Sequence, residues 1–221
     1  MQPPQQAVYE DSRREEVAPH IPRGSRNVLE VGCGRGGFCL TLRSALGPQA
    51  RIVGVEAMPE QAAVASDDHG FDAVATGYFP EALPEGEGPF DLVVFNDVLE
   101  HILEPEDLLR ALHDHLSPGG RVLATIPSIQ YAPVVWRLIR GRWDYADIGT
   151  LDRTHVRFFT RATMCEMFER AGYVVESCTG TNSVGRFAAS FPAPVRPFAK
   201  PLVRLLGDSQ YVHFVIVARR K

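Results

Sequence analysis

Residues 27–37, Asn-Val-Leu-Glu-Val-Gly-Cys-Gly-Arg-Gly-Gly, join a short apolar run to closely spaced glycines. The apolar run is typical of a buried strand, and the residues after the glycines continue with helical character to position 46. Glycines at such a turn let the backbone approach a ligand where any Cβ would collide. The segment therefore predicts a strand, a tight turn and a helix that together bind a nucleoside-type ligand.

The rest of the chain alternates between short β-branched runs and helical stretches. Helices are expected up to position 46, up to position 69, over 105–116, and from the N-cap Thr160 to position 171. Alternation of this kind predicts crossover units around a largely parallel sheet, an α/β fold of the doubly wound, Rossmann-like type. Strands are expected at 27–31, 51–56, 72–76, 90–96, 121–126, 173–179 and 211–218.

One main domain is expected over residues 26–221, preceded by an N-terminal segment, 1–25, with a short helix at 9–17. An irregular, aromatic-rich insertion occupies 127–159. The stretch 180–210 contains prolines that exclude one continuous helix, and we interpret it as a lid or arm.

The glycines alone do not identify the ligand, because Gly32, Gly34 and Gly37 also match the dinucleotide fingerprint. Glu56, at the end of the second expected strand, suits ribose hydroxyls in either case. Glu30 lies two residues before the first glycine, where a carboxylate favours a cationic group and disfavours a pyrophosphate. With the polar strand end at 96–101 and the turn at 116–120, these residues favour S-adenosylmethionine (SAM) over NAD.

This ordered set resembles the class I SAM-dependent methyltransferases, and the later stretch 141–160 resembles a branch of them often associated with glycan and polysaccharide biosynthesis. The resemblance extends over nearly the whole chain from about Tyr9. It implies SAM as cofactor and S-adenosylhomocysteine as product. It also implies a seven-stranded sheet that is mostly parallel with an antiparallel last strand.

By position, the resemblance assigns Glu30 and the glycines to the methionine end of SAM and Glu56 to the ribose. It places Asn96 and Asp97 beneath the sulfonium, and Met58 against adenine, although an ordinary core position explains Met58 equally well. The predicted cofactor-binding residues are Glu30, Gly32, Cys33, Gly34, Gly36, Glu56, Ala57, Met58, Gly77, Tyr78, Asn96, Asp97 and Val98.

The chain departs from the family pattern after the third strand. Many relatives have an acidic residue there to meet the adenine amine, whereas this chain has Gly77-Tyr78-Phe79. Backbone groups or Asp72 are the alternatives for that contact.

The insertion is dense in groups that bind or move protons, and it follows the fifth strand, at the edge where ligands of open α/β sheets collect. His155 is the predicted general base, with Asp152 to orient it, and His101 is the alternative. An alternative of equal weight is that His155 and Arg157 only tie the insertion to the sheet. The predicted substrate-binding residues are Tyr131, Trp143, Tyr145, Arg153 and Arg157.

We therefore predict a SAM-dependent methyltransferase that acts on an oxygen of a small-molecule or glycan-related acceptor. The alternatives are a quinone or lipid methyltransferase at a membrane surface, an NAD-dependent oxidoreductase, and a SAM-binding module without catalysis. The oxidoreductase is weakened because the chain contains no Tyr-x-x-x-Lys pair.

Composition and charge limit the kinds of partner that the protein is expected to bind. A net charge of −4 argues against nucleic acid, while the basic, aromatic 180–210 stretch is a candidate for contact with a membrane surface. The four cysteines show no metal-ligand spacing, so no metal is expected. The start of the chain lacks a secretory pattern, from which we expect a cytoplasmic location, and a homodimer is a further expectation from the fold type.

Overall fold

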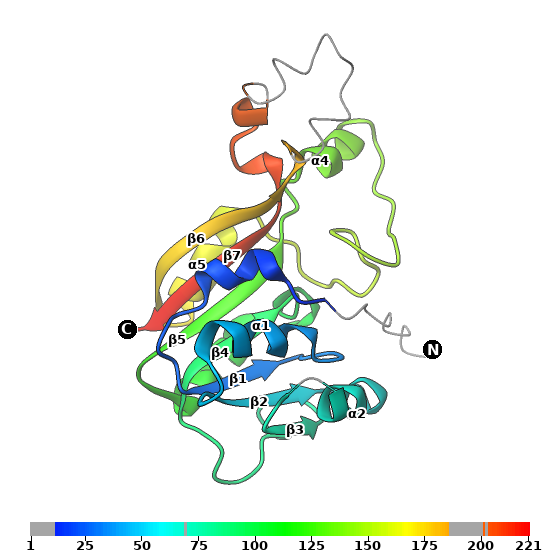
Figure 1. The fold of residues 1–221 in the computed structure, drawn as a ribbon. Helices are drawn as coiled ribbons and strands as arrows, with labels where there is room; N and C mark the ends of the chain where they lie inside the picture. Colours follow the sequence, from blue (N-terminus) through cyan, green and yellow to red (C-terminus); the bar gives the residue numbers. More distant parts are fainter. Residues whose placement is uncertain (1–11, 69, 186–200, 202) are drawn as a thin grey trace.

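The computed structural model describes residues 12–68, 70–185, 201 and 203–221. Within them the strands form one seven-stranded sheet in the order β3-β2-β1-β4-β5-β7-β6 (Figure 1). Pairing is parallel from β3 to β5, and β7 runs antiparallel to both β5 and β6. The predicted α/β fold, with seven strands and an antiparallel last strand, is confirmed.

The strands are β1 (Asn27–Val31), β2 (Arg51–Glu56), β3 (Ala73–Thr76), β4 (Phe90–Asn96), β5 (Leu116–Pro127), β6 (Tyr173–Ser183) and β7 (Tyr211–Arg220). The α-helices are α1 (Gly37–Leu46), α2 (Pro59–Asp68), α3 (Pro105–Ala111), α4 (Ala132–Ile139) and α5 (Arg161–Arg170). Short 3-10 helices are η1 (Glu15–His20), η2 (Leu99–His101), η3 (Leu112–His115) and η5 (Gly207–Gln210).

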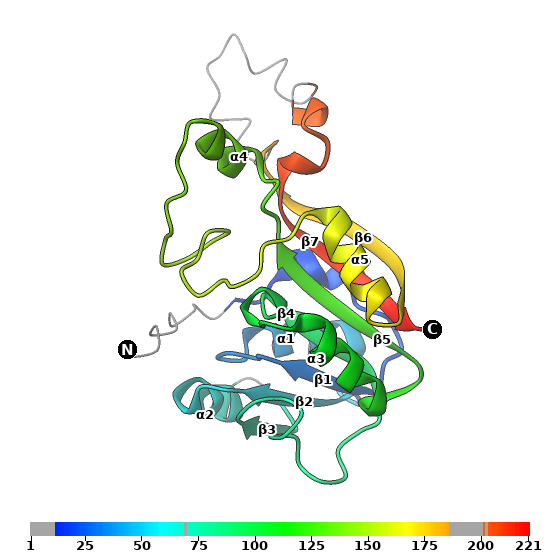
Figure 2. The ribbon, with the colours of Figure 1, turned by 180° about the vertical axis from the view of Figure 1, so that it is seen from behind.

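The central strands are apolar on both sides because each face of the sheet is covered by helices. Val28, Ile52 and Leu92 belong to one core together with Phe38 and Leu42 of α1. Alternate residues of the same strands belong to a second core that includes side chains of α3 and α5. Figure 1 shows α1 and η1 on the near face, and Figure 2 shows α3 and α5 on the other.

Several boundaries differ from the expectation. The helix expected over 105–116 is divided, because α3 ends at Ala111 and η3 tightens the chain before β5. β5 begins at Leu116 instead of 121, since Leu116 already pairs with Phe90 across a register shift. The short helix expected at 9–17 is instead η1, and residues 1–11 lie outside the described part.

The two irregular stretches contain more regular structure than expected. The 127–159 insertion holds the helix α4, and β6 extends beyond the expected end at 179 to Ser183. Of the expected arm at 180–210, residues 186–200 and 202 lie outside the described residues. None of the helices in the described part of the chain is long and apolar enough to cross a lipid bilayer.

Candidate functional site

A cavity of about 770 Å³ opens at the carboxyl ends of β1, β2 and β4. This is the edge at which open α/β sheets bind their ligands, and the volume suits a small molecule or cofactor. Every predicted cofactor-binding residue except Met58 lines the cavity. The Met58 sulfur instead accepts a hydrogen bond from Gln61 Nε2 at 2.9 Å.

The glycine turn shapes one wall of the cavity. Gly32, Gly34 and Gly36 all have positive φ angles of 55° to 97°, which favour glycine. A Cβ at Gly32 would lie 2.6 Å from Cγ2 of Val98, so the turn and the end of β4 pack too closely for a side chain. These residues therefore keep a backbone surface open toward the cavity.

Glu56 at the end of β2 holds the same turn. One carboxylate oxygen accepts a hydrogen bond from the Gly34 amide and the other from the Met58 amide, both at 2.8 Å. Since each oxygen has a second lone pair, the fixed carboxylate can also accept hydrogen bonds from ligand hydroxyls.

Glu30, near the end of β1, is a buried carboxyl group with an unsatisfied atom. Its Oε1 lies 3.5 Å from the Asn96 amide nitrogen, whereas Oε2 has no hydrogen-bond partner. Burial raises the pKa of Glu30 to about 8. A cationic hydrogen-bond donor in the cavity would satisfy this group and favour its charged form.

Arg14 reaches the cavity from the segment just before η1, a contact that sequence reasoning missed. Its guanidinium donates to Asp97, and to Oγ1 of Thr125 at 3.1 Å. Burial opposes the charge of Asp97, but His213 and Arg14 outweigh it and hold the pKa of Asp97 below its usual value. The floor of the cavity thus carries a fixed ion pair at the end of β4.

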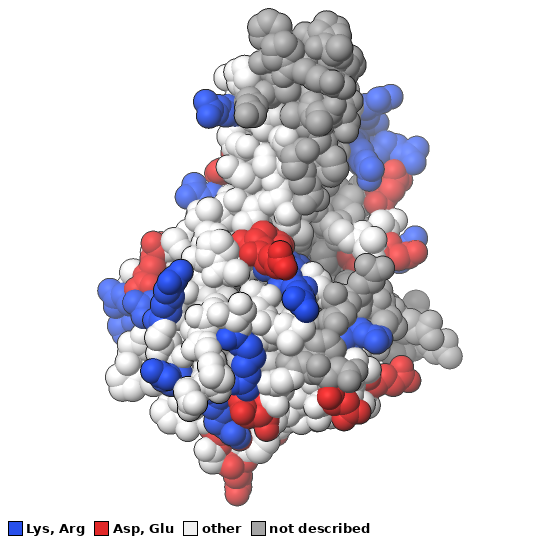
Figure 3. Space-filling view, in the orientation of Figure 1, with Lys and Arg blue, Asp and Glu red and all other residues white. Residues whose placement is uncertain are grey.

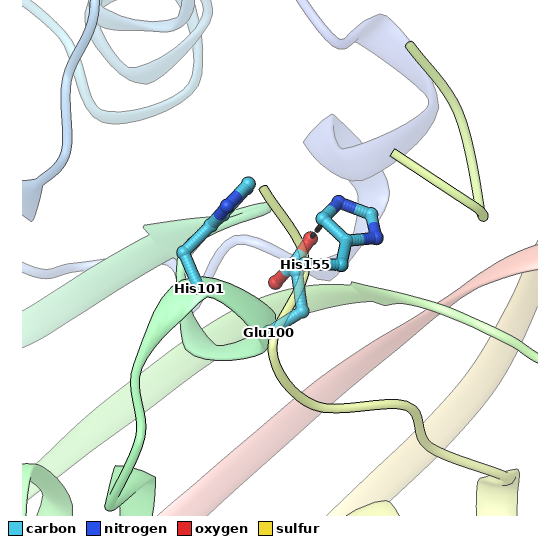
Figure 4. A group of neighbouring side chains, drawn as sticks. All are labelled: Glu100, His101 and His155. Atoms are coloured by element: carbon cyan, nitrogen blue, oxygen red, sulfur yellow. Dashed lines mark ion pairs between the residues drawn. The ribbon is translucent and has the colours of Figure 1, made fainter. Parts of the chain in front are cut away.

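Glu100, His101 and His155 form a cluster beside this ion pair (Figure 4). The His101 and His155 rings meet edge to face with centroids 4.7 Å apart, and His155 Nε2 lies 3.9 Å from Glu100 Oε1. Burial, and then the charge of Asp97, raise the pKa of Glu100 well above its usual value. Burial lowers the pKa of both histidines. Burial therefore favours the uncharged form of all three groups.

The two histidines differ in where they face. His101 lines the cavity, and its Nδ1 lies 3.2 Å from the Thr154 carbonyl, which assigns the proton to Nδ1 and the basic lone pair to Nε2. His155 is buried behind it, outside the cavity wall, with Nδ1 on the Thr150 carbonyl. Asp152 accepts hydrogen bonds from Thr154 and contributes nothing to the wall either.

The three residues of this cluster are also of types that can bind a metal ion. Within the described part of the chain, the ligand atoms of Glu100, His101 and His155 lie within 4.8 Å of one another. The expectation of no metal rested on the spacing of cysteines and histidines along the sequence, whereas these three residues come together from η2 and the insertion.

The structure does not bring the five predicted substrate-binding residues to the cavity wall. Arg153 pairs with Asp147 at 3.1 Å, and Arg157 donates to the Leu103 carbonyl at 2.7 Å. Trp143 packs edge to face on Phe158, Tyr145 lies beside it, and Tyr131 is the N-cap residue of α4. From the insertion, Ile148 is the residue that reaches the wall.

Asp72, an alternative for the adenine contact, lies at the wrong end of the sheet. It precedes β3 at the amino edge, where it accepts hydrogen bonds from Arg43 and from the Ile52 amide. Gly77, Tyr78, Phe79 and Gln61 line the cavity near the end of β3 instead.

The family model and the relatives that match this chain agree on one family. A family model described as a methyltransferase domain matches residues 6–178. The ubiquinone biosynthesis O-methyltransferase of Ruegeria pomeroyi is 32% identical over 172 residues, which cover 72% of this chain and 67% of that protein. The enzyme of the same name from Aeromonas salmonicida is 28% identical, over 71% of this chain and 66% of its own length. The chain thus spans about two thirds of the length of these relatives.

Solved structures share the fold. A SAM-dependent methyltransferase from Archaeoglobus fulgidus superposes with a TM-score of 0.68 at 17% identity, covering 95% of each chain. One from Mesorhizobium loti gives 0.59 at 21% identity, covering 93% of this chain and 96% of its own. Magnesium protoporphyrin IX methyltransferase from Synechocystis, solved with bound SAH, gives 0.60 at 14% identity over 95% and 84%.

Proposed function

Because this chain belongs to the SAM-dependent methyltransferase family, we propose that it methylates a hydroxyl oxygen of a small, quinone-related acceptor. The names of the relatives favour this alternative over a glycan-related acceptor. The observation that carries the proposal is the position of His101 in the wall of the cavity formed by the glycine turn, where burial lowers its pKa. A neutral imidazole is the group that can accept a hydroxyl proton near neutral pH.

The residues present fit SAM. The orphaned carboxyl oxygen of Glu30 suits the ammonium group of the methionine moiety, and the Arg14 guanidinium suits its carboxylate. Glu56 suits the ribose hydroxyls, and the 77–79 turn with Gln61 suits adenine. When bound, SAM supplies an electrophilic methyl group on a sulfonium.

The chemical step needs alignment and one proton acceptor. With SAM bound, its methyl group would be the electrophile for an acceptor oxygen held in line with it, and Nε2 of His101 would take the hydroxyl proton. We assign His101 as the base in place of His155, because His101 lines the cavity. His155 is a positioning residue that packs on the His101 ring.

The titration of Glu30 predicts how SAM affinity depends on pH. Glu30 is protonated below its pKa of about 8, and the ligand's ammonium group favours the charged carboxylate, so binding below that pH releases a proton. SAM affinity should therefore rise as the pH increases toward about 8, by up to about tenfold per pH unit, and should stop rising above it. Isothermal titration in buffers of different ionisation enthalpy measures the released proton. Glu30→Gln is the control, and a pH slope that survives this change would contradict the assignment.

Methyl transfer to a panel of candidate acceptors tests the proposed acceptor class. We expect the purified protein, supplied with methyl-labelled SAM, to methylate polyprenyl-substituted phenols and catechols on oxygen, as a new methoxy group in the mass spectrum. Short-chain phenols and sugars are the comparison acceptors. Transfer to sugars alone, or SAM binding with no transfer to any acceptor, would reject the quinone-related proposal.

A further inference from the structure

The middle of the 127–159 insertion is a continuous exposed stretch. Every residue from 136 to 149, hereafter the 136–149 segment, is exposed to solvent. Ile139 and Ile148 are both 71% exposed, and an apolar surface of this kind on a folded protein marks a contact surface. The large apolar and aromatic residues of the segment are Trp136, Leu138, Ile139, Trp143, Tyr145 and Ile148.

The charges within the segment are mainly basic. Arg142 pairs with Asp144 at 2.9 Å, and Asp147 pairs with Arg153 from outside the segment. Arg137 and Arg140 make no ion pair with any residue that the structure describes. Figure 3 shows basic side chains gathered at this end of the molecule, beside α4. Two uncompensated positive charges thus lie among exposed apolar side chains.

We propose that the 136–149 segment docks on a lipid surface that carries anionic head groups. Tryptophan and tyrosine prefer the boundary between hydrocarbon and head groups, and arginine binds phosphate there while its stem stays apolar. α4, with eight residues, is about 12 Å long, too short to span the bilayer, so the segment lies along the surface. Anionic lipid is the occupant that satisfies the apolar side chains and the two free arginines together.

The docking orients the cavity. Ile148 belongs to the segment and also lines the cavity, so a lipid surface against the segment lies at the cavity mouth. An acceptor with an apolar tail would then enter without leaving the bilayer. This consequence for the acceptor rests on the proposed function, whereas the docking itself does not.

The two tryptophans make the docking directly observable, because Trp136 and Trp143 are the two tryptophans of the whole sequence. We expect their fluorescence to shift to shorter wavelength with vesicles of phosphatidylcholine and phosphatidylglycerol, and to be quenched by brominated lipid. Vesicles of phosphatidylcholine alone should give little change, and high salt should reverse the shift. The measurement needs neither SAM nor an acceptor, so its failure is distinct from failure of the proposed reaction.

Variants of the two arginines test the electrostatic contribution to vesicle binding. Arg137→Gln with Arg140→Gln should weaken vesicle binding by roughly fivefold for each arginine lost. The matched control is Arg23→Gln with Arg26→Gln, which removes the same charge from exposed residues beside the amino end of β1, and should leave vesicle binding unchanged. Ile139→Ser should weaken binding without changing its salt dependence.

Three results would overturn the proposal. One is the absence of a spectral shift with anionic vesicles. Another is an equal loss of binding in the two arginine pairs, which would indicate a non-specific effect of net charge. The third is a dimer in solution whose tryptophans are already shielded without lipid, which would make the segment an interface between copies of the chain.

Discussion

His101→Ala should lower kcat by about 10²- to 10⁴-fold, the range expected when a positioned general base is removed. SAM affinity should remain within about threefold of the parent value, because the groups assigned to SAM are Glu30, Arg14 and Glu56. The acid limb of the kcat/KM profile should disappear with His101, since its pKa, lowered by burial and by His155, sets that limb. Steady-state kinetics on the phenolic acceptor across pH, with SAM titration, measures all three.

Two other histidine variants make this result specific. His155→Ala should lower kcat less and move the acid limb to higher pH, because burial and the neighbouring His155 both depress the pKa of His101. His20→Ala, on η1, controls for general effects of losing a histidine. If His155→Ala lost activity and His101→Ala kept it, the base would be the buried histidine after all. Repeating the assays with a chelator and with added divalent metal tests whether the Glu100 cluster acts through a metal.

That the residues around the glycine turn line one cavity could be predicted, because they are local in the sequence. Gly32, Gly34 and Glu30 belong to one strand and its turn, and the strand pattern places Glu56 at the end of the neighbouring strand. Parallel strands bring their carboxyl ends to one edge, so position along the chain becomes position in space. The buried parallel strands β1, β2, β4 and β5 could be predicted because such strands have a clear apolar signature.

The acceptor half could not be predicted in the same way, because its contacts join distant and irregular segments. Arg14 meets Asp97 across 83 positions, and no local pattern marks it. His101 and His155 are separated by more than 50 residues, and which of them faces the cavity depends on how the insertion folds back over η2. Polar density directed the prediction to the insertion, but the aromatic and basic residues chosen there lie outside the cavity wall.

Burial gives the same residue type different chemistry within the site. Glu56 is held by two backbone amides, whereas Glu30 and Glu100 have carboxyl oxygens without hydrogen-bond partners and raised pKa values. A carboxylate fixed by amides is ready to accept from hydroxyls, while a buried, protonated carboxyl responds to charge brought by a ligand. The sequence shows only that carboxyl groups are present at these positions, and the difference in their roles comes from the packing around each one.

Glu56→Ala should weaken SAM binding by about 10²- to 10⁴-fold, because charge-assisted hydrogen bonds contribute about 1.5–3 kcal/mol each and two ribose hydroxyls are available. Part of the loss comes from the turn itself, since the Gly34 and Met58 amides both lose their acceptor. Glu56→Gln separates the two causes, because one amide oxygen can still accept from Gly34 while the charge toward the ribose is gone. Isothermal titration with SAM and S-adenosylhomocysteine measures the affinities. Thermal unfolding of the same variants measures how much the protein is destabilised when the turn loses its contacts with residue 56. A loss smaller than about threefold in Glu56→Ala would mean that the ribose lies elsewhere, since it is below the energy of even one such hydrogen bond.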